Sequence, residues 1–78
     1  MGGASTKKTT PLDIIKFRAR LREARGSRTM KEVAAAVGLS SKQAYQAYES
    51  GRVVPKIDLC EEFARKLGVD PAWLAGWK

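Results

Sequence analysis

The sequence predicts one compact all-α domain of five short helices, and three observations support this prediction. Apolar residues after residue 10 recur at three- and four-residue spacing, the period of a helix with one buried face. No stretch shows the alternation of a strand, and glycine or proline ends each helical pattern. The chain has 78 residues, 44% of them hydrophobic, which suits a single small core and excludes a two-domain enzyme.

The first helix is predicted over residues 11–25. Thr10 is its expected N-cap, Pro11 its first helical residue, and Asp13 the acidic residue three positions after the cap. Gly26 is expected to end it. Its apolar face comprises Ile14, Phe17, Leu21 and Ala24.

The second helix is predicted over residues 30–37. Thr29 and Glu32 have the spacing of a capping box, in which each side chain accepts a hydrogen bond from the backbone of the other. The predicted inner face of this helix comprises Val33, Ala34 and Val37.

The third helix is predicted over residues 42–49, after a turn of three or four residues. Ser40 and Gln43 again have capping-box spacing. Gly38 supplies the left-handed backbone conformation of the turn. Ala34, four residues earlier, is small enough for two helices to cross closely there. The second and third helices therefore have the pattern of a helix-turn-helix, a motif that places its second helix in the DNA major groove.

Two helices remain after a loop between Gly51 and Pro55. Asp70 and Pro71 begin the last one, predicted over residues 72–75. The fourth is ended by Gly68, and its apolar face comprises Ile57, Cys60, Phe63, Ala64 and Leu67, so that Cys60 is expected to be a core residue.

The composition argues against catalysis and cofactors. One cysteine cannot form an internal disulfide, and the absence of histidine makes a zinc or iron site or a histidine-based triad a poor hypothesis. We therefore expect no enzyme activity, no cofactor, no metal and no small-molecule ligand. No apolar run is long enough for a signal peptide or membrane span, so a cytoplasmic, nucleoid-associated protein without membrane contact is expected.

The charge points to a polyanionic partner. Lys+Arg number 15 against Asp+Glu 8, a net charge of +7 that is concentrated in the first 25 residues. Residues 1–9 lack periodicity and are expected to form a flexible basic arm, with the DNA-binding domain over residues 10–78. Lys7 and Lys8 in this arm either wrap around a duplex or belong to an untethered tail.

Four sequence motifs follow one another along the chain: LREARG at 21–26, TxKEVAxxVGLS at 29–40, YExGxxxP at 48–55 and IDLCxxFAxxLGVDxxWL at 57–74. Together they resemble the lambda-repressor-like, Xre-type helix-turn-helix family. The resemblance implies five helices, DNA binding through the second and third, and usually a homodimer that represses transcription from a two-fold symmetric operator. The family also contains antitoxins.

The spacing from Gly38 to Gly51 is one residue longer than the family's, which leaves two registers for the third helix. Either Tyr45 and Tyr48 face the core, or Ala44 and Ala47 do and the tyrosines turn outward. We favour the inward tyrosines, because two aromatic rings fill a small core better than two alanines.

The polar residues of the third helix are the predicted base contacts. A glutamine amide can pair with adenine N6 and N7, and a lysine can reach guanine O6 and N7. The alternative is an ordinary solvated helix face. The predicted base-contacting residues are Lys42, Gln43 and Gln46.

Further roles are assigned around them. Arg22 and Glu49 match a family pair that positions the third helix, and Leu74 and Trp77 are expected at the dimer interface, although the indole of Trp77 can also fold back on its own domain. Met30 stands where the family often has glutamine. The predicted DNA backbone contacts are Thr29, Met30, Lys31, Ser41, Tyr45 (in its outward register), Arg52, Lys56, Lys7 and Lys8.

The leading hypothesis is thus a sequence-specific regulator that binds double-stranded DNA as a homodimer. An antitoxin-like module on the same scaffold, which binds a protein partner, is the alternative. A sequence-neutral DNA-compacting protein is a third hypothesis, and the glutamines of the third helix argue against it.

Overall fold

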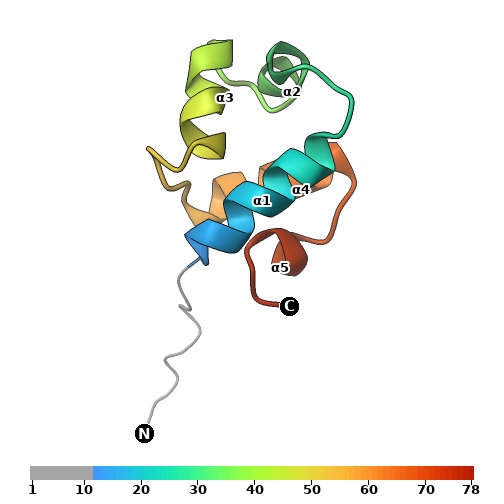
Figure 1. Cartoon of the computed structure of the whole chain (residues 1–78). Coiled ribbons are helices and arrows are strands. Elements are labelled where there is room, and N and C mark those ends of the chain that lie inside the picture. The colour runs from blue at the N-terminus through green and yellow to red at the C-terminus, as the bar shows by residue number, and fades with distance from the viewer. Residues whose placement is uncertain (1–11) are drawn as a thin grey trace, which may run out of the picture.

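A computed structural model describes residues 12–78, and this part of the chain is all-helical, as predicted. α1 and α4 form the centre, α2 and α3 lie at one end, and α5 lies at the other (Figure 1). The helices are α1 (Ile14–Arg25), α2 (Met30–Ala36), α3 (Lys42–Glu49), α4 (Ile57–Leu67) and α5 (Pro71–Leu74).

α1 begins later than predicted. Asp13 is its N-cap, with extended backbone, and its carboxylate accepts a hydrogen bond from the Lys16 N–H at 3.2 Å. The Asp13 N–H donates to the Ala75 carbonyl at 2.9 Å, so a contact with the end of α5 holds this residue outside the helix. The predicted start at residue 11 is therefore wrong. Thr10, Pro11 and the arm over residues 1–9 lie outside the described residues.

Of the two capping boxes predicted from the sequence, only that of α2 is present. The Glu32 N–H donates to Thr29 Oγ1 at 3.0 Å and the Thr29 N–H donates to Glu32 Oε1 at 2.7 Å, which confirms the first capping box. α2 ends one residue before the prediction. The second capping box is wrong, because Ser41 and not Ser40 caps α3, accepting from the Ala44 N–H at 3.1 Å.

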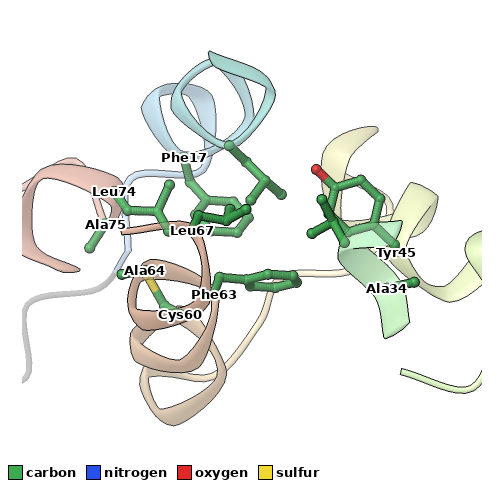
Figure 2. Close-up of a cluster of buried hydrophobic side chains, with 11 residues drawn as sticks. Phe17, Ala34, Tyr45, Cys60, Phe63, Ala64, Leu67, Leu74 and Ala75 are labelled. Carbon is green, nitrogen blue, oxygen red and sulfur yellow. The ribbon is translucent and has the colours of Figure 1, made fainter. Parts of the chain in front are cut away.

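Aromatic rings from three helices meet in the core. The Phe63 ring lies 6.2 Å from Phe17, 5.9 Å from Tyr45 and 5.7 Å from Tyr48, measured between ring centroids. Figure 2 shows Phe63 of α4 pointing between Phe17 of α1 and Tyr45 of α3. Tyr45 is 0% exposed and Tyr48 is half-buried, so the inward register of the tyrosines is confirmed. The small Ala47 side chain is also buried, although it does not belong to this core cluster.

α4 and α5 complete the core. Cys60 is buried as predicted, and burial raises the pKa of its thiol to about 11. Ile57 was predicted on the buried face, but at the first turn of α4 it is 36% exposed, so that assignment is wrong. α5 begins at Pro71 after the N-cap Asp70 and ends at Leu74, one residue earlier at each end than predicted.

Hydrogen bonds and a cation–π contact join α5 and the residue after it to α1 and its N-cap, in addition to apolar packing. In addition to the bond between Asp13 and Ala75, the Arg20 guanidinium lies 5.1 Å from the Trp73 ring centroid and donates a hydrogen bond to the Trp73 carbonyl. Leu74 and Ala75 are themselves core residues. The last turn of the fold thus closes the core over α1.

Candidate nucleic-acid interface

The turn between α2 and α3 has the geometry that the sequence predicts. Gly38 has a φ of +79°, and no atom lies within 4 Å of a Cβ built on it, so conformation rather than space requires glycine. The Leu39 N–H donates to the Ala34 carbonyl at 2.8 Å, which closes the end of α2. Ala34 is buried where the two helices pack together. The turn therefore sets the angle at which α3 leaves α2.

A shallow groove of about 340 Å³ runs between the two helices on the surface. Lys31 lines it from α2, and Ser41, Lys42 and Gln43 line it from the start of α3. Two predicted backbone contacts and two predicted base contacts are thus brought together on one surface. Two alanines of α2, and Leu39 and Ser40 of the turn, also line it.

The predicted base-contacting residues are all accessible. Lys42, Gln43 and Gln46 are exposed on α3, opposite the side that Tyr45 buries. Tyr45 itself cannot contact DNA, because its ring is fully buried and its hydroxyl donates to Glu49. Its assignment as a backbone contact belonged to the outward register and is therefore wrong.

The other predicted backbone contacts lie on both sides of α3. Thr29 and Lys31 are exposed at the start of α2, whereas the Met30 side chain is half-buried and packs against the core. Arg52 and Lys56 are exposed in the loop between α3 and α4. Lys7 and Lys8 lie outside the described residues.

A buried carboxylate anchors the C-terminal end of α3. Glu49 is 4% exposed, and Arg25 of α1 donates to both of its oxygens, Nε to Oε2 at 3.0 Å and Nη2 to Oε1 at 3.1 Å. The Tyr45 hydroxyl donates to Oε2 at 2.7 Å. Arg22, the partner named from the sequence, is more distant, with Nε 3.8 Å from Oε1 and a side chain that is 74% exposed.

Arg25 was therefore missed as the closer partner of Glu49. The LREARG motif contains both arginines, and their spacing of three places them on one face of α1. The signal for either residue was thus present in the sequence. The choice between them depends on where α3 crosses α1, which the spacing does not give.

The pKa values in this network follow from its geometry. Burial alone would raise the pKa of the Glu49 carboxyl, but hydrogen bonds from Arg25 and Tyr45, and the charges of both arginines, lower it below its ordinary value. Burial raises the pKa of Tyr45, and its bond to the carboxylate raises it further. Both effects keep the phenol protonated, and hence a donor.

α1 also holds the backbone at the end of α3. Arg18 Nε donates to the Glu49 carbonyl at 3.3 Å, one of the carbonyls that a helix end leaves without an intrahelical partner. Gly51 follows closely, and its α-carbon approaches the Arg18 side chain. Backbone and side chain of Glu49 are thus both bound to α1.

The predicted dimer interface needs a correction. Leu74 is 0% exposed in the single chain, because it belongs to the core between α1 and α4, and it offers no surface to a second copy. Trp77 is 45% exposed. Other exposed large apolar side chains are Ile15, Val53, Val54 and Ile57.

Residues 12–78 show neither a membrane-spanning helix nor a cluster of metal-binding side chains. No helix there has the length and apolar character that crossing a membrane requires. Within the same residues, no three His, Cys, Asp or Glu side chains gather where a metal ion could bind.

Comparison with protein-family models matches residues 19–74, more than half of the chain, to the helix-turn-helix family. No curated protein and no solved structure matches the chain. The matched range includes all of α2, α3 and α4 and the turn at Gly38. The chain therefore belongs to the Xre or lambda-repressor-like helix-turn-helix family and is a DNA-binding regulator.

Proposed function

We propose that this regulator recognises a specific double-stranded DNA sequence by inserting α3 into the major groove, and that it acts as a homodimer repressing transcription at a two-fold symmetric operator. The observation that carries the proposal is the division of α3 into two faces. Gln43 and Gln46 are exposed on one, and Tyr45 and Glu49 fix the other to the core. A base-reading face on a rigid support is what direct readout requires.

The exposed face of α3 suits base recognition more than simple charge attraction. Gln43 and Gln46 each carry a donor and an acceptor that match the major-groove edge of adenine. Lys42 is the one cationic side chain of α3 and is exposed, whereas the one acidic side chain of this helix, Glu49, is buried against Arg25. Selectivity in this proposal therefore comes from the two amides and Lys42.

Phosphate contacts would flank this face. Lys31 and Ser41 line the groove between α2 and α3, and Arg52 and Lys56 follow α3 in the chain. A helix in the major groove has a phosphate strand on each side, so basic groups before and after α3 can hold its register without reading bases. Thr29, the Met30 backbone, Lys7 and Lys8 complete the proposed contact set.

The homodimer and its operator are the finer part of the proposal. Two copies related by a two-fold axis would place their α3 helices about 34 Å apart, one turn of DNA. Trp77 remains the proposed interface residue after Leu74 is excluded. Repression would follow when the bound dimer occludes the polymerase, in the cytoplasm where the nucleoid lies.

Selection of binding sites from random duplex DNA tests this proposal. We expect enrichment of an inverted repeat with half-sites about one helical turn apart. Equal recovery of all sequences would support DNA compaction instead, and no recovery would support an antitoxin-like protein-interaction module. A reporter promoter overlapping the selected site then separates repression from activation.

The salt dependence of binding tests the phosphate contacts. If a dimer neutralises six to ten phosphates, affinity should fall by about 10³- to 10⁵-fold between 50 and 200 mM salt. The measurement is a titration of the selected site at several salt concentrations. An affinity independent of salt would contradict the proposed phosphate contacts.

A further inference from the structure

The hydroxyl of Tyr45 is a polar group in the interior of the domain. It lies on the core side of α3, its residue is 0% exposed, and it donates to Glu49 Oε2 one turn later at 2.7 Å. The same oxygen accepts from Arg25 Nε of α1 at 3.0 Å. One carboxylate oxygen thus accepts one hydrogen bond from within α3 and one from the central helix α1.

We propose that the Tyr45 hydroxyl is a positioning group: by holding the Glu49 carboxylate against Arg25 of α1, it fixes the rotation of α3 about its own axis and thereby directs Gln43 and Gln46 at the bases. The inference rests on the proposed function and adds to it a residue that does not itself touch DNA. Rotation matters because successive residues of an α-helix are about 100° apart. A shift of one residue would exchange Tyr45 for Ala44 on the core side.

Apolar burial alone defines this rotation loosely. The two tyrosine rings pack on Phe63 in T-shaped, edge-to-face arrangements, which are van der Waals contacts without the directionality of a hydrogen bond. A buried hydrogen bond to a charged acceptor is short and directional. The bond from Tyr45 to Glu49 lies within α3, so it acts on the rotation indirectly: it holds the Glu49 carboxylate in the orientation that meets Arg25, and the bonds from Arg25 join this side of α3 to α1.

The groups around Glu49 leave the hydroxyl no substitute. Arg25 already donates to both carboxylate oxygens, Arg22 Nε stays at 3.8 Å, and Arg18 is bound to the backbone carbonyl of Glu49. All three arginines belong to α1. Tyr45 is thus the donor through which α3 itself holds the carboxylate.

Tyr48 provides the matched control. Its ring also packs on Phe63, at 5.7 Å, but its hydroxyl forms no hydrogen bond with the described part of the chain. Tyr45→Phe and Tyr48→Phe therefore remove the same atom from the same helix. Only the first removes a bond to Glu49.

The test measures, for both variants, affinity for the selected operator and for random duplex DNA, at a temperature where circular dichroism shows a folded domain. We expect Tyr45→Phe to lower the ratio of operator to random affinity by about three- to tenfold, by loss of one buried hydrogen bond. Tyr48→Phe should change this ratio by less than about twofold. A purely structural role for Tyr45 would lower stability but leave the ratio of the folded protein unchanged.

Hydrogen exchange of the free protein supplies a readout that needs no DNA. Amides of α3 should exchange faster in Tyr45→Phe than in Tyr48→Phe, relative to those of α4. An unchanged affinity ratio, unchanged α3 exchange, or equal effects of the two substitutions would overturn the positioning role. Absence of sequence preference in the unsubstituted protein would instead overturn the proposed function, and exchange would still decide whether the hydroxyl holds α3.

Discussion

Gly51 shows how a single residue connects the end of α3 to α1. Its φ is +82°, a conformation that L side chains rarely adopt, and a Cβ built on it would lie 2.7 Å from Arg18 Cδ. Arg18 uses its Nε to bond the Glu49 carbonyl. A side chain at residue 51 would therefore strain the backbone and also displace the arginine.

Gly51→Ala should reduce the free energy of unfolding more than Gly68→Ala. Both glycines have positive φ, so each substitution carries a backbone penalty of about 1–2 kcal/mol. Gly68 has no atom within 4 Å of a built Cβ, whereas Gly51→Ala also disrupts the Arg18 bond, adding about 0.5–1.5 kcal/mol. Urea denaturation measures both. The difference should disappear in an Arg18→Ala background, and equal losses in the native background would contradict the argument.

Gln43 tests base reading at the same scale. Gln43→Ala should weaken binding to the selected operator by about 1–3 kcal/mol and leave binding to random DNA nearly unchanged, because an amide that pairs with a base carries no charge. Titrations of both DNAs at one salt concentration give the comparison. An equal loss on both would show that Gln43 does not read a base.

Single residues also mark the limit of sequence reasoning. The family resemblance gave Arg22 as the partner of Glu49, and Arg22 does lie near it. Arg25 lies on the same face of α1, and only the crossing with α3 shows that it is the closer partner. Leu74 was assigned to a dimer interface, because its spacing cannot distinguish a surface between subunits from the core of one subunit. The exposed residues of α3 were predictable, because helical periodicity alone separates them from the buried face.

At the scale of elements, helices were easier to locate than to delimit. Helical spacing, glycine stops and cap patterns together predicted all five, whereas two of the N-caps were misplaced. Thr10 was chosen for α1 because Pro11 and Asp13 follow it at the spacing of a helix start. The contact that holds Asp13 outside the helix comes from Ala75, far along the chain, and local spacing does not reveal it. For α3, adjacent serines offered two equivalent caps, and the turn geometry after Gly38 decides between them.

The serines of the turn give a direct test of this reading. Ser41→Ala should lower the free energy of unfolding by about 0.5–2 kcal/mol, because it removes the bond to the Ala44 N–H. Ser40→Ala, on an exposed neighbour, should change it by less than about 0.5 kcal/mol. Thermal or urea unfolding without DNA measures both. A larger effect at Ser40 would show that Ser40, as predicted from the sequence, is the N-cap of α3.

At the scale of the whole molecule, Glu49 connects the DNA-binding end to acid stability. The pKa of its carboxyl is lowered in the folded state, against burial, by Arg25 and Tyr45. Folding therefore favours the charged form, and the resulting stabilisation is present above the unfolded-state pKa and lost as pH falls through the folded-state pKa.

The unfolding free energy should thus decrease on acidification from about pH 7 to about pH 2, and Glu49→Gln should make this decrease shallower. The variant should be less stable than the unsubstituted protein near neutrality, and the difference should narrow in acid. Urea denaturation at several pH values measures this. Parallel curves for the two proteins would show that Glu49 does not carry the acid dependence.

The contact between the two ends of the fold has a consequence for synthesis. Asp13 is bonded to Ala75, and Leu74 fills the core beneath α1, so the core between α1 and α4 is not fully covered until Ala75 has been added. A ribosome makes the DNA-reading helix well before the residues that close the core supporting it. The nascent chain should therefore gain DNA affinity late and in one step, and a chain terminated before Leu74 should be degraded rather than compete for the operator.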